Sequence, residues 1–377
     1  MKKHNLLFLF ALTFLLVPTN TPVMAAKYSA SESKKVRTFQ KSYHRLSQKN
    51  YDRISLFAVQ PNFGIPFSAG VLDPDYIKTS MAYVNYYRSL VGLPDDANYA
   101  NDNVNSQLGA AALASVNAEQ NLRAHGLQGY VKPGYISDTD WDTAENTTLG
   151  NINFSESTSG TTAGEIVTDL IREDNNIAGN GNIGHRGMIL STRATRMGIG
   201  AAYGTENNVL YSVEHGLFAD DILRQPVKSR IVYPAAGVFP YELVGGKTPW
   251  SYSTTERISG QPKIYITDLT TKKKRQATQV RNFGTTFYGD GYTTTITYRP
   301  GKTKLINTHK YRVQIGKHYS YSFRFFRQNS TLKNKQIVKH RKWNTLICKT
   351  AQAVVHPAWA VLDSNKYCSL FNNLHVK

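Results

Sequence analysis

The spacing of apolar residues changes once along the chain, and this change predicts the fold class. Between residues 73 and 213 the chain contains two strand-like runs and several helical stripes, the first of which is Ile77, Met81, Val84 and Leu90. Residues 228–326 have no such stripe and carry short runs of β-branched and aromatic residues between turns. Apolar residues three or four positions apart indicate a helix, whereas short runs of this composition indicate strands. The sequence therefore predicts an α/β domain followed by a small all-β domain, an immunoglobulin-like sandwich.

The first 26 residues have the three parts of a secretory signal peptide. A basic start is followed by an apolar run from Leu6 to Val17 and by small residues at Ala25 and Ala26. The run is shorter than the roughly 20 residues that a membrane-spanning helix needs, and no second long apolar run follows. We expect cleavage after Ala25 or Ala26 and an exported mature chain without a transmembrane segment.

Two further segments are polar and have weak periodicity. Residues 27–69 are rich in Lys, Ser and Gln, and we expect a polar linker with one short helix there. We place the α/β domain at residues 70–222 and the β-sandwich at residues 228–326. Residues 327–377 form a basic tail to which the sequence assigns no structure. Because the tail holds the only two cysteines of the chain, a disulfide-dense fold is excluded and the core must be apolar.

The chain has a large excess of positive charge. Its 45 Lys and Arg residues and 26 Asp and Glu residues give a formal net charge of +19. In an exported protein this balance favours an anionic partner, such as a cell-wall polymer, lipid headgroups or acidic glycans, and argues against nucleic acid. Short basic runs such as Lys34-Lys35 are more often simply solvated, so the excess by itself identifies no partner.

Two segments before residue 160 supply the first candidate site residues. The second predicted helix begins at Asp102 and carries the apolar stripe Val104, Leu108, Ala111, Ala118 and Leu122. His125 lies three residues after Leu122 and seven after Ala118, so it falls on the same buried stripe. Residues 126–160 are rich in Gly, Asp, Thr and Asn and predict a loop, in which Glu145 stands beside an asparagine.

The third predicted helix, from Glu165 to about Asp174, supplies a second acid. Its apolar face consists of Val167, Leu170 and Ile171. Asp174 lies four residues after Leu170, so it continues this face, whereas Glu173 lies to the side and is the alternative acid. The helix dipole disfavours a carboxylate at a helix C-terminus, so we expect Arg186 or a metal to compensate it.

A second histidine follows a glycine- and asparagine-rich loop. The stretch from Gly179 to Gly200 reads GNGNIGHRGMILSTRATRMGIG and places His185 at the start of a short apolar helix. The helix dipole favours the neutral imidazole there and leaves a nitrogen lone pair free. Two strand-like runs, residues 197–203 and 209–213, follow with a turn between them and predict a hairpin.

Two imidazoles and two carboxylates thus come from four separate segments. They are His125, Glu145, Asp174 and His185, with Glu173 as the alternative acid. Such a set suits a divalent metal, zinc or calcium, with His125 and His185 as its ligands, or an acid–base pair that activates water. Each residue also has a simpler explanation, such as a buried histidine bonded to the backbone or an acid paired with Arg186.

The run from Val84 to Pro94, VNYYRSLVGLP, resembles the first-helix motif of the CAP superfamily, the cysteine-rich secretory proteins, antigen five and pathogenesis-related proteins. The later pieces match in order: a helix that ends in His125, Ala144-Glu145-Asn146, an acidic helix, Gly184-His185-Arg186 and Gly198-Ile199-Gly200. The resemblance covers roughly residues 70–222.

This resemblance implies an α-β-α sandwich whose central cleft holds a tetrad of two histidines and two acids. His125, Glu145 and His185 match the tetrad by position. The family usually has a glutamate on the third helix, so Glu173 competes there with Asp174, which the helical spacing favours. The chain lacks the disulfides of eukaryotic members and so resembles a bacterial secreted type.

The sequence therefore predicts a secreted CAP-type protein, held near the cell wall, whose cleft binds a divalent metal and an apolar or lipid ligand. It leaves open whether the protein is an enzyme. One alternative is a metal-assisted hydrolase or peptidase, although no nucleophilic serine or cysteine accompanies the tetrad. Glu214-His215 lacks the second histidine of the HExxH zinc motif and is set aside. Another alternative is a cell-wall adhesion module in which aromatic and basic residues of 228–326, including Tyr311, Arg312 and Tyr321, form the binding face.

Overall fold

The computed structural model describes residues 28–285 and 291–332. The expected signal peptide, most of the basic tail and both cysteines lie outside the described residues. The described chain as far as Gln328 belongs to one unit. Within these residues no helix is both long enough and apolar enough to cross a membrane.

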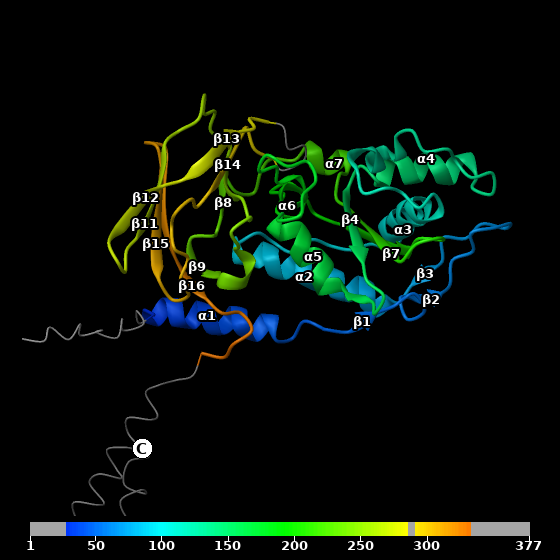
Figure 1. The fold of residues 1–377 in the computed structure, drawn as a ribbon, viewed down its shortest axis with the longest axis horizontal. Coiled ribbons are helices and arrows are strands. Elements are labelled where there is room, and N and C mark those ends of the chain that lie inside the picture. Colours follow the sequence, from blue (N-terminus) through cyan, green and yellow to red (C-terminus); the bar gives the residue numbers. More distant parts are fainter. Residues whose placement is uncertain (1–27, 286–290, 333–377) are drawn as a thin grey trace, which may run out of the picture. The chain divides into compact units, whose positions relative to one another are not determined.

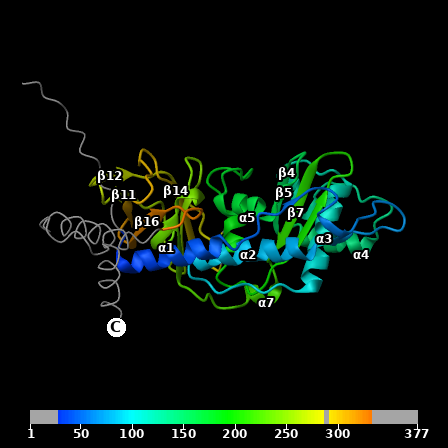
Figure 2. The same ribbon diagram turned by 90° about the horizontal axis from the view of Figure 1, so that it is seen from below.

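A three-stranded antiparallel sheet forms the centre of the first group of elements (Figure 1). Across the sheet the order is β4 (Asn151–Glu156), β7 (Val209–His215) and β6 (Gly198–Tyr203). One face of the sheet contacts α3 (Ala100–Ser115), and the other is covered by α2 (Pro74–Leu90) and α5 (Ala163–Arg172), as Figure 2 shows. Strands β6 and β7 form the predicted hairpin. The fold is therefore mixed α/β, as expected.

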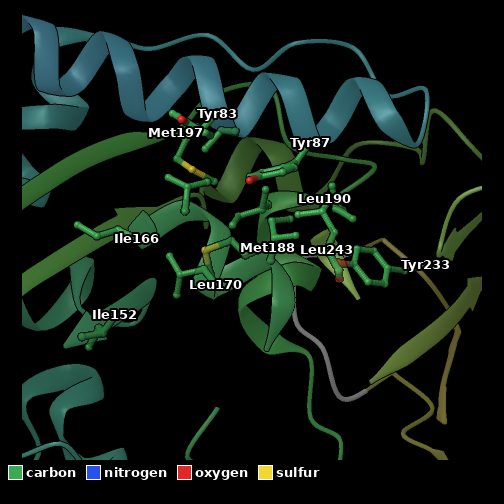
Figure 3. Packing of buried hydrophobic residues seen from close by; sticks show 14 of the residues in the cluster. Tyr83, Tyr87, Ile152, Ile166, Leu170, Met188, Leu190, Met197, Tyr233 and Leu243 are labelled. Carbon is green, nitrogen blue, oxygen red and sulfur yellow. The ribbon is translucent and has the colours of Figure 1, made fainter. Parts of the chain in front are cut away.

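Helix α2 begins and ends where the sequence predicts. Asp73 caps it by accepting a hydrogen bond from the Asp75 amide, and Pro74 occupies the first helical position. The helix ends at Leu90, shortly before Gly92 takes a φ of 71°. The rings of Tyr83 and Tyr87 point from α2 into a core that also receives side chains from α5 and α6 (Gly184–Ile189) (Figure 3).

Helix α3 packs on the sheet through small residues, which differs from the predicted stripe. Its buried residues include Gly109 and the alanines at 110–112 and 114, whereas Val104 is 59% exposed. A Cβ atom on Gly200 of β6 would lie only 2.1 Å from the Ser106 carbonyl oxygen. The backbones of α3 and β6 are therefore in direct contact, and a stripe of large residues has no space there.

The helix that was expected to reach His125 ends at Ser115. Asn117 takes a left-handed conformation, with φ 45°, and breaks the helical repeat. A separate 3₁₀ segment, η1 (Leu122–Leu127), then begins after Asn121, whose side chain accepts a hydrogen bond from the Arg123 amide. His125 thus lies on a turn and not on the second helix.

Residues 126–160, expected to be a loop, contain a helix and a strand. Helix α4 (Asp138–Thr147) is capped by the Ser137 hydroxyl, which accepts a hydrogen bond from the Asp140 amide at 3.1 Å. Glu145 therefore lies in a helix. Strand β4 follows and places two asparagines, Asn151 and Asn153, on one side of the sheet at a two-residue period.

Helix α5 ends at Arg172, before the two acids that follow it. The next residue, Glu173, is left-handed with φ 60°. The spacing of four residues per face applies only inside a helix, so Asp174 does not continue the face of Leu170.

The second group of elements consists of two small sheets. One sheet has the strand order β13 (Thr278–Asn282), β14 (Thr294–Arg299), β10 (Trp250–Thr254) and β8 (Arg230–Tyr233). The other has the order β12 (Lys273–Gln276), β11 (Ile264–Asp268), β15 (Lys310–Ile315), β16 (Tyr319–Phe326) and β9 (Gly237–Pro240). The short β-rich runs of the sequence at residues 263–266, 293–298, 311–315 and 319–326 overlap β11, β14, β15 and β16. Between the sheets the ring of Trp250 lies 5.5 Å from that of Phe323.

The aromatic residues of the expected binding face lie mostly in this core. Tyr311 of β15 and Tyr321 of β16 are buried, whereas Arg312, the residue after Tyr311, is exposed. The pattern therefore reflects the two faces of a sheet, one packed and one in water. This arrangement weakens the adhesion alternative, because the rings are not available to a wall polymer.

Residues 27–69 hold more structure than the expected polar linker. Helix α1 (Ala30–Tyr43) begins with a capping box formed by Ser29 and Glu32 and contacts α2 and β9. The short strands β1 (Asn50–Tyr51) and β2 (Phe57–Val59) follow, and β2 pairs with β3 (Val71–Leu72). Tyr51 is fully buried, so the segment belongs to the core and does not act as a spacer.

We predict that Gly200→Ala lowers the free energy of unfolding by about 3 kcal/mol, because the new methyl group overlaps the backbone of α3. Urea denaturation of the two proteins measures the difference. Gly134→Ala is the control, since a Cβ atom there would meet nothing within 4 Å and the change should stay within about 0.5 kcal/mol. Equal unfolding midpoints for Gly200→Ala and the wild type would contradict the close contact.

Candidate functional site

A cavity of about 410 Å³ opens between η1, β4, α5 and the loop that leads into α6. The titratable side chains that line it are His125, Asp169, Glu173 and His185. The two histidines expected at the site therefore share one cavity, although η1 and α6 are separate in the sequence. Five asparagines of β4 and the α5–α6 loop also line it, namely Asn151, Asn153, Asn175, Asn176 and Asn182.

Glu173 holds His185 in place. Nδ1 of His185 lies 2.8 Å from Oε2 of Glu173, and the Glu173 side chain is fully buried. The same oxygen accepts a hydrogen bond from Asn176 at 2.8 Å, and Oε1 accepts one from the Arg186 backbone amide at 2.7 Å. Three donors thus stabilise the carboxylate, and a carboxylate that only accepts requires the proton of His185 to lie on Nδ1. The left-handed turn at Glu173 is what directs this side chain toward α6.

The surroundings of His185 favour its protonated form, whereas the sequence predicted the neutral form. Burial lowers the pKa of His185, but the negative charge and the hydrogen bond of Glu173 raise it more, so that the pKa lies above its ordinary value. The dipole of the six-residue helix α6 was expected to favour the neutral imidazole. The adjacent carboxylate outweighs that dipole.

His125 has the opposite electrostatic environment. Its Nδ1 donates to the Thr148 carbonyl oxygen at 2.9 Å, which leaves Nε2 with a lone pair. Burial lowers the pKa of His125, and the positive charge of nearby His185 lowers it further. The cavity therefore holds one imidazole that favours the neutral form and one that favours the charged form.

Two of the residues expected at the site lie elsewhere. Oδ1 of Asp174 accepts a hydrogen bond from Thr248 at 2.5 Å, and Oδ2 pairs with Arg172. Glu145 accepts a hydrogen bond from the indole of Trp141 on the previous turn of α4, at 2.9 Å. Neither lines the cavity, so the choice of Asp174 was wrong and the alternative acid, Glu173, is the one that contacts His185.

Arg186 was expected to compensate the acid at the end of α5 with its side-chain charge, but it contacts this acid through its backbone amide. Its guanidinium donates to the carbonyl oxygens of Ile171, Arg172 and Pro249, and to no carboxylate of the residues that the structure describes. The backbone amide of Arg186, by contrast, donates to Glu173. The acid at the end of α5 is thus stabilised by N–H groups at the start of α6.

No protein-family model matches the chain, and none of the curated proteins matches it. The assignment of the site residues accordingly rests on the geometry of the cavity.

Sequence reasoning assigned neither of two acids near the histidines to the site, and it set Glu214 aside with the incomplete HExxH motif. Asp169 accepts hydrogen bonds from Asn153 and Asn175, at 2.9 and 2.7 Å. Glu214 of β7 lies opposite Asn151 of β4, which lines the cavity, and is itself buried; burial raises its pKa to about 7, although Asn151 and the charge of His185 lower it. An acid inside an otherwise apolar central strand was the available signal, because such a group is rarely buried without a purpose or a partner.

We predict that Glu173→Gln lowers the pKa of His185, because the substitution removes the negative charge that raises it. An NMR titration of the imidazole nitrogens measures this value in the folded protein. Asp174→Asn is the matched control, since Asp174 faces Thr248 and Arg172. A lower His185 pKa in Asp174→Asn, with no change in Glu173→Gln, would reverse the assignment of the acid.

Proposed function

We propose that residues 70–222 form a CAP-type domain of an exported protein, and that its cleft binds a divalent transition-metal ion through His125 and His185. The order of elements supports this proposal, because helices cover both faces of a three-stranded antiparallel sheet. The motif that resembles the family's first helix lies on α2, and Gly184-His185-Arg186 begins α6. The two facing sheets of residues 230–326 fit an appended β-sandwich of immunoglobulin-like type.

The observation that carries the metal proposal is the state of the two Nδ1 atoms. A metal-binding histidine almost always donates its other ring N–H to a carboxylate or a backbone carbonyl, which orients the ring and increases its basicity. His125 does this with Thr148 and His185 does it with Glu173. In the neutral form each ring therefore carries its lone pair on Nε2, and we propose that both lone pairs face one ligand in the shared cavity.

The donor set favours zinc over calcium and implies weak binding. Imidazole nitrogen suits Zn²⁺, whereas Ca²⁺ prefers several oxygen ligands. The carboxylates of Glu173 and Asp169 already accept hydrogen bonds at both oxygens, so they orient other groups. In the part of the chain that the structure describes, no three His, Cys, Asp or Glu residues form a metal-binding cluster. A metal here would keep positions open for water or for a ligand.

The rim of the cavity supports an apolar or lipid ligand beside the metal. Three large apolar side chains, Leu122, Leu149 and Ile177, line the cavity and are 44–55% exposed. The asparagines lie deeper and offer hydrogen bonds. A ligand with a polar end and an apolar body fits this arrangement.

We predict that zinc binds the wild-type mature protein and that the double variant His125→Ala/His185→Ala loses this binding, as isothermal titration calorimetry measures. His44→Ala/His318→Ala is the control, because both of these histidines are exposed and neither lines the cavity. The affinity should rise between about pH 6 and pH 8, since a protonated His185 cannot ligate and Glu173 raises its pKa. Equal heats for the wild type and the His125/His185 variant would remove the metal site.

A hydrolase is the second candidate, and the opposite pKa shifts of the histidines favour it. Environments that separate the pKa values of two groups assign one as a base and the other as an acid. His125 then accepts a proton from water and the charged His185, held by Glu173, donates one to the leaving group.

We predict for this candidate that the wild type cleaves a peptide library and that His125→Asn and Glu173→Gln abolish cleavage. Glu145→Gln should keep it, because Glu145 is bonded to Trp141 outside the cavity. Mass spectrometry of the peptides, with and without chelator, measures the products. If the peptides are cleaved no faster than in buffer, the hydrolase candidate is refuted and only the binding function remains.

A further inference from the structure

A second cavity, of about 730 Å³, lies between α1, the C-terminal end of α2 and strands β8 and β9. We call it the α1 groove. It shares no residue with the cavity of the two histidines. Its volume lies in the range of about 300–1,000 Å³ that is usual for small-molecule sites. The groove exists only because α1, expected to be part of a linker, packs against the strands.

The charged residues of the α1 groove are all cationic. Lys34 and Lys35 reach it from α1, and Lys228 and Arg230 reach it from the start of β8. No aspartate or glutamate belongs to its lining among the residues that the structure describes. Four like charges in one hollow repel one another, and an anion relieves that repulsion.

Three of the four cations have no acidic partner in the described parts of the chain. Lys34 and Lys35 are exposed and form no ion pair there, and the Lys228 ammonium group donates to the Val91 carbonyl oxygen at 2.5 Å. Burial without a nearby acid lowers the pKa of Lys228. Arg230 pairs with Glu256 at 3.1 Å and lies over the ring of Tyr319, but Glu256 is outside the groove.

Most of the other lining residues of the groove are apolar. Phe39 of α1, Leu90 of α2, Ile231 of β8, Val238 of β9 and Tyr319 of β16 contribute side chains to its wall. A hydrophilic polyanion, such as a sugar phosphate polymer, gains nothing from such a wall. An acyl chain gains about 25 cal/mol for each Å² of apolar surface that it buries.

We propose that the α1 groove binds an anionic amphiphile, whose carboxylate or phosphate contacts the four cations and whose hydrocarbon chain lies along the apolar wall. The proposal does not depend on the metal site. It gives one of the short basic runs, Lys34-Lys35, a role that sequence alone could not assign.

The test is calorimetric titration of the full mature chain with oleate below its micelle-forming concentration. We expect saturable binding to the wild type that weakens as salt is added, because salt screens the cations. Lys34→Glu/Lys35→Glu should weaken binding about tenfold or more, since the change reverses two of the four charges. Thr38→Trp should also weaken it, because the indole fills the groove without a change in charge.

The matched control is Lys273→Glu/Lys302→Glu, which makes the same change in net charge at two exposed lysines outside the groove. It should bind oleate as the wild type does. Circular dichroism confirms that each variant is folded. The anion source is distinguished by titration with lysophosphatidic acid and with inorganic phosphate, of which only the former should bind.

Several outcomes would overturn the proposal. One is equal oleate binding by Lys34→Glu/Lys35→Glu and by the control variant. Another is equally tight binding of an uncharged amphiphile such as a monoacylglycerol, and a third is tight binding of inorganic phosphate alone. Absence of oleate and lysophosphatidic acid binding to the wild type would also refute it.

Discussion

The buried guanidinium of Arg186 is the contact on which the arrangement of both groups of elements depends. Its nitrogens donate to the carbonyl oxygens of Ile171 and Arg172 at the end of α5, at 2.7 and 3.0 Å, and to that of Pro249 before β10, at 2.7 Å. Its plane lies over the ring of Tyr233, 3.8 Å from the ring centre. The last carbonyl groups of a helix need donors from outside it, and one side chain supplies them here while it joins the helices to the sheets.

The same residue and a second arginine also fix the short helix that carries His185. Six residues are too few for a helix that is stable by itself. At its start the Arg186 amide donates to Glu173, and at its end the buried Arg88 donates to the carbonyl oxygens of Ile189 and Ser191. Arg88 pairs in turn with Asp96 at 2.9 Å, and neither side chain is exposed. His185 is therefore held by interactions on both sides of its own helix, which is how a rigid site is built.

The sequence predicted those parts of the fold that a local repeat encodes. Helix α2, the β6–β7 hairpin and strands β11, β14, β15 and β16 each have a regular apolar pattern that the structure follows. Helix α4 was missed because it is polar, and its formation depends on Ser137 and on acids in its first turn. Helix α3 was misread because its contact with β6 uses Gly and Ala, which leave no stripe of large residues.

For the candidate site, the sequence correctly brought the two histidines together. It did not predict which acid lies beside them, because that depends on the path of the chain after a helix ends. His125 and His185 share a cavity as expected, although His125 reaches it from a turn. Asp174 was preferred over Glu173 because the helical spacing of α5 was assumed to continue past Arg172. The helix ends there, and the left-handed Glu173 changes the direction of the chain. Glu145 matched a motif by position, but its side chain contacts Trp141. The apolar pattern of the sequence does not reveal that one residue, here Glu173, leaves the helical conformation.

Helix α1 comes early in the sequence, yet several of its partners come last. Gln40 donates to the Arg327 carbonyl oxygen, 287 residues further along the chain, and Tyr28 just before the helix donates to that of Phe325, 297 residues further. Phe39 also stacks on Phe326. During translation α1 therefore leaves the ribosome long before β16 exists, so these contacts form only near the end of synthesis, whereas the contacts of α1 with α2 can form early. A nascent or truncated chain that stops short of Phe326 therefore lacks these contacts and leaves this side of α1 exposed to chaperones and proteases.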